Sequence, residues 1–270
     1  SDTHSLPAAF RHLGSFWWVS QLTRRLLRPQ RHGALRTMLR AAARESGLTA
    51  ALSGGGGPVI GMHVRHGDAC LTSETSRTAR SCEPLSAYMA AIQAYAAAVG
   101  ATTVFLATDS DRVLADARHL FPRFSFLHVP NVTRTGLARR APTEVLDEVI
   151  KRRARTGVGV AQTEHDALTA AVDALLLSRC DILVGKFSSG LFRAAYALAA
   201  ARRAGGLPPF VSLDAPWCAD YAVPAGFNDN FPRREREGRD ALWEQIDPDG
   251  GTKRGGRGTM GRSEQNVFLC

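Results

Sequence analysis

The chain has 270 residues, of which 44% are hydrophobic and 22% are charged, so it is long enough to bury a large core without disulfides or metal ions. No apolar run approaches the roughly 20 residues that a bilayer requires, which excludes a membrane-spanning segment within the sequence. The formal net charge is +9, from 34 Lys and Arg against 25 Asp and Glu. This charge permits an anionic ligand such as nucleic acid, a nucleoside diphosphate or a membrane surface, but it selects none of them.

The first 50 residues predict two amphipathic helices. The first contains Phe16 and Trp17, continues with leucines at helical spacing and ends before Pro29, and the second spans residues 34–47. A glycine run at residues 54–57 precedes the first predicted strand. Because a dinucleotide-binding glycine loop follows its strand and opens a helix, we interpret this run as a linker.

From residue 58 onward, short β-branched or apolar runs alternate with longer helical segments. This alternation predicts an α/β fold with a Rossmann-like, doubly wound parallel sheet that is covered by helices on both faces. The common strand order places the first and fourth strands side by side, so ligand should bind between the loops that follow them. The predicted strands are 58–64, 102–107, 124–129, 181–185 and 209–213, and the predicted helices are 84–99, 111–120, 164–179 and 189–204.

Two further regions lack this regular pattern. Residues 130–163 form an Arg-rich insertion with a short helix expected around 144–155, and a loosely ordered tail is expected after Pro216. The five cysteines contain no CxxC pair, which argues against a zinc ribbon or a thioredoxin-type redox site. Cys70 and Cys82 would form a loop disulfide in an oxidising compartment, and the sequon at Asn131 points weakly to the same compartment.

Polar side chains follow the two strands that we expect at the centre of the sheet. Arg65 comes directly after the first strand, and a guanidinium fork suits two diphosphate oxygens. Ser188 and Ser189 stand where a helix begins, where hydroxyls and free backbone N–H groups form an anion site. Taken singly, Arg65 is equally well explained as a member of a surface ion pair, and the two serines as an ordinary helix N-cap. Together they predict a pyrophosphate pocket.

Four other acidic or imidazole positions also need an interpretation. Asp173 lies inside an apolar helix and needs a partner, which is either structural, such as Arg193 or a backbone N–H, or the N1–H and N2–H edge of guanine. Asp109, after the second strand, is interpreted as a helix N-cap. His63 and His66 are not expected to bind a metal, because alternation along a strand end points their rings to opposite faces.

Five segments also match a known family in order and in spacing: FWWVSQLTRRLLRPQ, GMHVRHGD, FLATDSDRVLADARHLFP, DALLLSRCDILVGKFSSGLFRAAYAL and FVSLDAPW. They resemble the catalytic region of the α1,6-fucosyltransferases that modify the N-glycan core. Nodulation fucosyltransferases and, more distantly, protein O-fucosyltransferases share the HxRxxD-like motif. The resemblance covers most of residues 10–217.

The resemblance implies the donor-binding half of a GT-B glycosyltransferase, with GDP-fucose as donor, inversion at the anomeric carbon and no metal or other cofactor. Residues 1–50 would then be a helical segment from the end of the acceptor-side domain, 51–222 the GDP-sugar-binding domain, and 223–270 a basic tail. The implied partner is a glycan or glycoprotein acceptor in the Golgi lumen of the secretory pathway, with a type II membrane anchor outside this segment. The resemblance does not decide between a monomer and a homodimer.

The resemblance also assigns roles to individual residues. Arg65 matches an essential arginine at the β-phosphate, and His63 and Asp173 match a guanine-recognition pair. Asp68 matches the motif aspartate, and Glu74 is the nearest candidate for the base, one position out of register. Four further residues are implied in donor binding: Asp109 matches a family carboxylate, Ser188 and Ser189 match the FSS segment, and Lys186 is a possible replacement for a lost charge.

The sequence departs from the family pattern in the loop after the first predicted strand. His66 replaces the second motif arginine, and Gly67 and Ala69 replace the motif Thr and Lys. A protonated His66, or Lys186, would restore the missing charge at the departing diphosphate. A second hypothesis is therefore a catalytically inactive relative that acts as a nucleotide-binding, glycan-binding or structural module. Nucleic-acid binding is not expected, since the basic residues are scattered or confined to tails without an aromatic platform.

Overall fold

The computed structural model describes residues 7–66, 83–130, 151–152, 154–157, 160–203 and 207–213. Several predictions fall outside these residues. They are the roles of Asp68 and Glu74, the Cys70/Cys82 disulfide, the sequon at Asn131 and the C-terminal tail.

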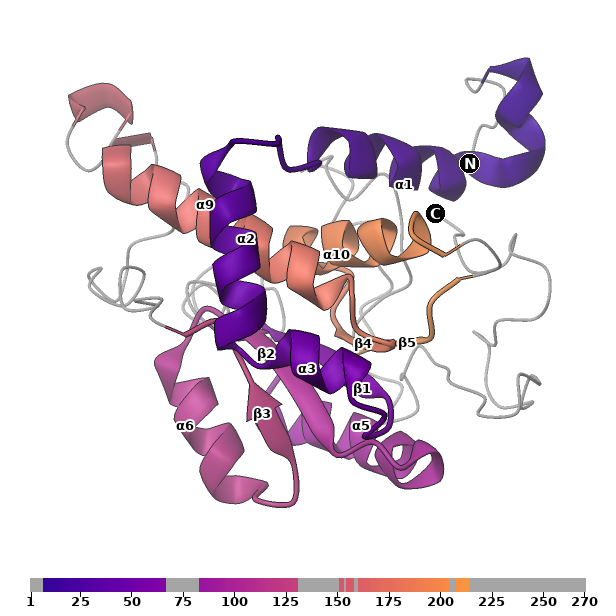
Figure 1. Cartoon of the computed structure of the whole chain (residues 1–270), viewed down its shortest axis with the longest axis vertical. Coiled ribbons are helices and arrows are strands. Elements are labelled where there is room, and N and C mark those ends of the chain that lie inside the picture. Colours follow the sequence, from indigo (N-terminus) through magenta and orange to yellow (C-terminus); the bar gives the residue numbers. More distant parts are fainter. Residues whose placement is uncertain are drawn as a thin grey trace, which may run out of the picture.

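A five-stranded parallel sheet forms the centre of the molecule, with the order β3-β2-β1-β4-β5 (Figure 1). The first and fourth strands are direct neighbours, paired from Ile60↔Ile182 to Met62↔Val184. The chain therefore runs outward from the centre in both directions, and the prediction of a doubly wound α/β sheet is confirmed. The strands are β1 (Val59–Val64), β2 (Thr103–Thr108), β3 (Ser125–Leu127), β4 (Ile182–Gly185) and β5 (Phe210–Ser212).

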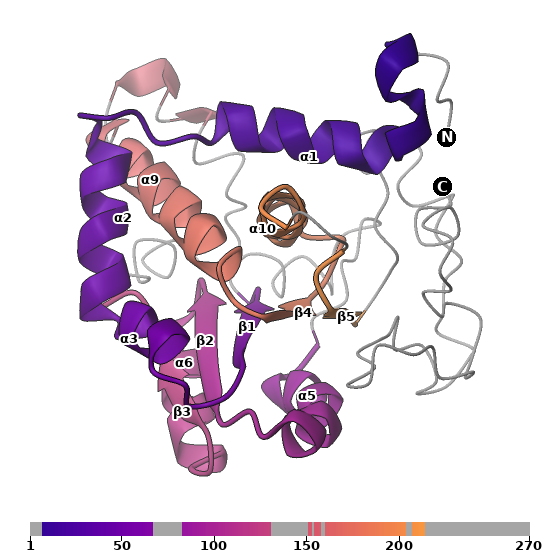
Figure 2. The same cartoon turned by 45° about the vertical axis from the view of Figure 1, so that its right-hand side comes forward.

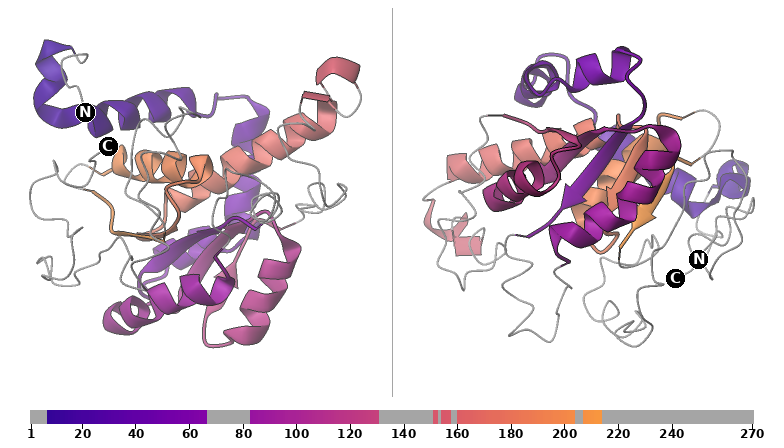
Figure 3. Two further views of the ribbon diagram at one scale, coloured as in Figure 1. Left: turned by 180° about the vertical axis from the view of Figure 1, so that it is seen from behind. Right: turned by 90° about the horizontal axis from the view of Figure 1, so that it is seen from below.

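Helices cover both faces of the sheet, as Figures 1 and 3 show. One face is covered by α5 (Leu85–Val99) and α6 (Asp111–Leu120), and the other by α9 (Val160–Leu177) and α10 (Gly190–Ala200). Each of these helices occupies a segment where apolar periodicity predicted one. Right-handed crossovers place the helices on one face while the chain moves from β1 to β3 and on the other face once it returns to β4 and β5, so this arrangement follows from the sheet order.

The N-terminal helices form an outer layer on the α9/α10 side (Figure 2). After a 3-10 turn at Ala8–Leu13, α1 (Gly14–Leu26) packs on α10, and α2 (Ala34–Glu45) packs on α9. Phe16 and Leu39 are buried in the same core as these two helices. A short helix that the sequence did not predict, α3 (Leu48–Ser53), follows Gly47, whose φ of +77° suits glycine. The expected domain boundary at residue 51 falls inside α3.

Strand β1 is buried along its whole length, which explains its almost unbroken apolar sequence. Ile60, Met62 and Val64 belong to the core beneath α5 and α6, whereas Val59 belongs to the core beneath α9 and α10. Because side chains alternate between the two faces of a strand, His63 shares the α9/α10 face with Val59. The sequence of β1 therefore aims one polar ring at the interior of that layer.

Helix α10 packs directly on the backbone of β4 where the strand ends. A Cβ atom at Gly185 would lie 2.5 Å from a ring carbon of Phe192, so only glycine fits there without movement. The Phe192 ring is fully buried and also contacts Phe187, at 5.1 Å between ring centroids. The absence of a side chain at Gly185 thus sets how closely α10 approaches the sheet.

Gly185→Ala is expected to lower the free energy of unfolding by about 1–3 kcal/mol, because the new methyl group overpacks against Phe192. Urea denaturation followed by circular dichroism measures this change. Gly190→Ala is the matched control, because a Cβ atom at Gly190 meets no atom within 4 Å, and its effect should stay below about 1 kcal/mol. Equal stability of the Gly185→Ala variant and the unmodified chain would contradict the close packing.

Candidate functional site

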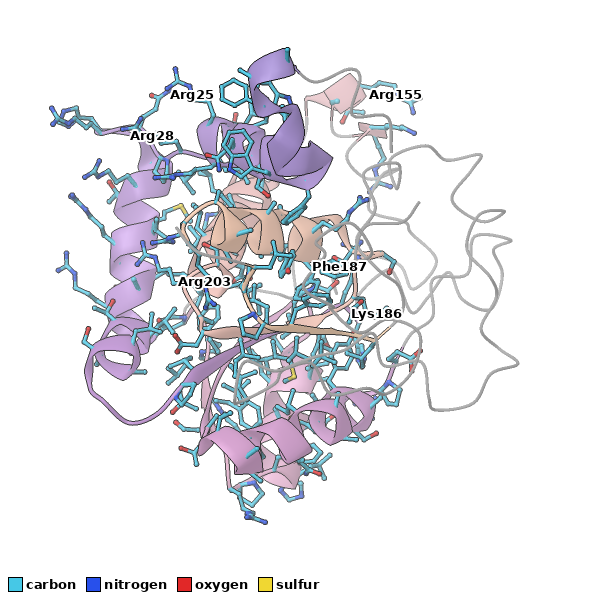
Figure 4. All side chains as sticks on the ribbon, turned by 90° about the vertical axis from the view of Figure 1, so that its right-hand side faces the viewer. Arg25, Arg28, Arg155, Lys186, Phe187 and Arg203 are labelled. Atoms are coloured by element: carbon cyan, nitrogen blue, oxygen red, sulfur yellow. The ribbon has the colours of Figure 1, made fainter. Side chains whose placement is uncertain are left out.

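The carboxyl ends of β1 and β4 lie side by side, and the segments that leave them carry most of the predicted site residues that the structure describes. Arg65 follows β1 directly, and Lys186 follows β4 directly. Figure 4 shows Lys186 and Phe187 close together where β4 ends. In a doubly wound sheet this is the edge at which the chain direction divides and ligands bind.

His63 is the innermost member of this group. Its side chain is 5% exposed, and its ring stacks on Phe192 with centroids 6.3 Å apart and planes 10° apart. Burial lowers the pKa of His63 to about 3, and the positive charges of Arg65 and Lys186 contribute to the decrease. The imidazole is therefore neutral at physiological pH. Its Nδ1 atom is buried and has no hydrogen-bond partner in the described part of the chain.

Two cationic side chains stand beside this neutral ring. Lys186 is only 7% exposed, and Arg65 is half-buried. Fully exposed lysines are the norm, so a buried lysine next to an arginine marks a position where a negative charge is favourable. Both cations also interact with other groups of the chain, and their charges contribute to the low pKa of His63. Together they concentrate positive charge in surroundings of low dielectric constant, where an anion would be held strongly.

The N-terminus of α10 begins at the same edge. Ser189 is the N-cap residue of α10, as predicted for the serines at this position, and its backbone N–H donates to the Lys186 carbonyl at 3.0 Å. Its side chain forms no capping hydrogen bond, and its buried Oγ has no partner within the described residues. Ser188 precedes it in the same turn. The first N–H groups of a helix lack intrahelical acceptors, so this turn presents donors and a positive dipole end.

Asp109 does not cap a helix, which corrects the interpretation from sequence. The N-cap of α6 is Ser110, and the Asp109 carboxylate instead accepts the backbone N–H of His66 at 2.8 Å. The His66 ring is also bound, because its Nε2 lies 2.7 Å from the backbone carbonyl of Glu83 and donates to it. Asp109 thereby fastens the segment after β1 to the end of β2 and fixes the backbone next to Arg65.

Asp173 lies on α9, on the side of the sheet that His63 also faces. Its carboxylate is 6% exposed and interacts with other groups of the chain, so the partner that a buried carboxylate requires is present. Sequence reasoning missed Phe192, which supports the His63 ring, and Ser212, whose Oγ accepts the Phe187 N–H at 3.4 Å. Both look like ordinary core or strand residues until the tertiary structure places them here.

The described residues contain neither a metal-binding cluster nor a membrane-spanning helix. No group of three or more His, Cys, Asp or Glu side chains among them is placed to hold a metal ion. Nor is any helix in this part of the chain both long and apolar enough to cross a membrane.

Comparison with known proteins identifies relatives. The family described as alpha-(1,6)-fucosyltransferase N- and catalytic domains matches residues 6–152. The alpha-(1,6)-fucosyltransferase of Drosophila melanogaster is 28% identical over 205 residues, which are 73% of this chain and 27% of that protein. The chain therefore spans about a quarter of the length of this curated relative.

Solved structures of a bacterial fucosyltransferase are also similar. NodZ from Bradyrhizobium is 22% identical, with a TM-score of 0.36 over 68% of this chain and 45% of that chain. NodZ alpha-1,6-fucosyltransferase soaked with GDP-fucose is 21% identical, with a TM-score of 0.37 over the same shares. TM-scores of this size carry no argument about function, and the α/β fold is established by the sheet of this chain itself.

His63→Phe is expected to reduce the loss of stability in acid. The pKa of His63 is depressed in the folded state, so the unfolded chain binds one more proton between the unfolded value of about 6.5 and the folded value of about 3. This proton removes stability as the pH falls through that window, with a slope of up to about 1.4 kcal/mol per pH unit. Phenylalanine cannot be protonated and preserves the stacking on Phe192.

Urea denaturation at pH 7.5, 6.5, 5.5 and 4.5 measures the slope for the unmodified chain and for His63→Phe. The exposed His119 on α6, changed to Gln, is the control and should leave the slope as it is. Parallel curves for His63→Phe and the unmodified chain would show that His63 is not buried as a neutral ring.

Proposed function

The chain belongs to the alpha-(1,6)-fucosyltransferase family, and we propose that it binds GDP-fucose at the joint carboxyl edge of β1 and β4 and transfers fucose to a glycan hydroxyl. One observation carries the proposal. A buried, neutral His63 lies near two cations, Arg65 and Lys186, whose charges lower its pKa, at the edge where α10 begins. A nucleoside diphosphate requires both features, an uncharged polar group for its base and positive charge for its phosphates.

In this proposal some residues at the carboxyl edge of β1 and β4 bind the diphosphate of the nucleotide and others bind its guanine base. Arg65 and Lys186 bind the diphosphate oxygens, with the Ser188 and Ser189 hydroxyls and the first N–H groups of α10 as further donors. Neutral His63 offers one donor and one acceptor nitrogen to the guanine. Asp173 accepts from the guanine N1–H and N2–H. The Asp109 carboxylate keeps the segment that carries Arg65 in place through its bond to His66.

The transfer step is an in-line displacement at C1 of fucose. The acceptor hydroxyl oxygen forms the new bond to C1, the bond from C1 to the β-phosphate oxygen breaks, and the anomeric configuration inverts. The hydroxyl proton passes to Asp68 or Glu74, which lie outside the described residues. Without a metal, stabilisation of the departing GDP falls on Arg65, Lys186 and the α10 N-terminus. We place this reaction on a glycan or glycoprotein in the Golgi lumen, with any membrane anchor outside this segment.

A second candidate function is donor binding without transfer. It is favoured by His66, which occupies the position of the family's second motif arginine and whose Nε2 donates to the Glu83 carbonyl. That nitrogen is unavailable to a phosphate while this bond is kept. Of the described residues that follow β1, Arg65 then contributes the one guanidinium to the leaving group. A radiolabelled fucose transfer assay on an N-glycan acceptor separates the two functions, since only the first produces a labelled glycan.

Calorimetry tests the donor site directly. The chain should bind GDP and GDP-fucose, bind GMP and ADP at least about tenfold more weakly, and lose at least about tenfold in affinity for GDP on Arg65→Ala, because a charge-assisted hydrogen bond contributes about 1.5–3 kcal/mol. Arg112→Ala is the control for a change of charge, because Arg112 is 89% exposed on α6. Equal affinity for ADP and GDP, or an unchanged affinity of Arg65→Ala for GDP, would refute the proposed site.

A further inference from the structure

A cavity of about 390 Å³ lies at the opposite edge of the sheet, between the C-terminal ends of α9 and α10 and the beginning of β4. Arg179, Arg202 and Arg203 line it, together with Ser178, Asp181 and Leu52. In Figure 4, Arg203 and Lys186 lie apart, because Arg203 binds the Asp181 carbonyl just before β4 whereas Lys186 comes just after β4. The proposed donor site does not use this cavity.

Most of the arginines here are bound to neutral acceptors. Arg203 Nη2 donates to the Asp181 carbonyl at 2.8 Å, and Arg202 Nη1 donates to the Ser178 hydroxyl at 3.3 Å. Arg24 on α1 reaches the end of α10 and donates to the Ala201 carbonyl at 2.9 Å. Cations at the C-terminal ends of helices are favourable because they offset the dipole, and this explains Arg24, Arg202 and Arg203.

Arg179 likewise follows the C-terminal end of α9, so the dipole accounts for its charge but supplies no partner for its guanidinium. Its Nε is buried and has no hydrogen-bond partner among the described residues. The carboxylate of Asp181, the acidic residue that lines the cavity, accepts the Val59 N–H at 2.8 Å. Within the described residues no carboxylate forms an ion pair with Arg179, Arg202 or Arg203.

The positive charges in this cavity repel one another. Burial lowers the pKa of Arg179 and of Arg202, and the charges of Arg179 and Arg24 lower the pKa of Arg202 further. Arginine stays protonated, so this repulsion is present in the folded chain, and no ion pair within the described residues offsets it. A bound anion would remove it and would supply an acceptor to Arg179.

We propose that this cavity is a second anion site, which takes the phosphate group of a small soluble molecule. Guanidinium forks match the geometry of tetrahedral phosphate oxygens, and several of them converge here. The volume falls within the range of small-molecule sites. The cavity is open to solvent, with Arg202 and Arg203 exposed, so a soluble phosphate can enter it directly.

Thermal unfolding of the full chain with increasing inorganic phosphate, at constant ionic strength, tests the site. Phosphate at about 20 mM should raise Tm by several degrees, because a ligand that binds only the folded state stabilises it. In the Arg65→Ala background, which weakens phosphate binding at the donor edge, the shift should disappear on adding Arg179→Gln and should persist on adding Arg112→Gln. Arg179→Lys keeps the charge but not the fork, and it should lose at least about half of the shift.

Three results with inorganic phosphate would overturn the proposal: no shift in the unmodified chain, a shift that Arg179→Gln retains in the Arg65→Ala background, and a shift that Arg65→Ala alone removes. The last would place the phosphate at the donor edge, so failure of this site is distinguishable from failure of the proposed function. Circular dichroism without phosphate checks that Arg179→Gln folds, and removal of a repelled cation should leave its Tm unchanged or higher. A membrane headgroup is tested with phosphatidylcholine vesicles that contain phosphatidic acid. If the chain binds these vesicles through Arg179 but does not respond to inorganic phosphate, the proposal of a soluble ligand is also overturned.

Discussion

Parallel pairing of β1 with β4 is the constraint on which the candidate site depends. The two strands are far apart in sequence, and only their adjacency brings Arg65 and His63 next to Lys186 and the start of α10. Close packing maintains this arrangement, because Gly185 has no side chain and the Phe192 ring occupies that space. The same ring stacks on His63, so the packing of α10 and the orientation of the imidazole are coupled.

The charges at the carboxyl edge of β1 and β4 lower the stability of the folded chain. A neutral histidine held between cations weakens folding in acid, and buried Lys186 costs desolvation free energy. Natural proteins accept such costs mainly where a ligand repays them. The arginine cavity at the other edge of the sheet also carries an electrostatic cost, because Arg179 has positive neighbours and no ion pair within the described residues. An anion bound among these arginines would turn repulsion into attraction.

Local sequence pattern was sufficient to predict the sheet. Apolar runs such as 58–64 and Ala-rich helices at the right spacing leave few alternatives to a doubly wound order, and topology then placed Arg65, Lys186 and Ser189 at one edge. Helix α3 was missed because six residues are too short for periodicity to show. The interpretation of Asp109 as a helix N-cap was wrong because its partner, the His66 N–H, is 43 residues away in sequence. The arginine cavity depends wholly on long-range contacts, which spacing does not reveal.

Amide hydrogen exchange with and without saturating GDP tests the central claim most directly, since it reports on each segment of the folded chain. The account predicts slower exchange with GDP in the segments after β1 and β4, residues 63–66 and 186–190. Exchange at residues 85–99 on α5, which covers the far face of the sheet, should not change. Slower exchange confined to other segments, or no change at a GDP concentration that saturates binding, would contradict a nucleotide site at the carboxyl edge of β1 and β4.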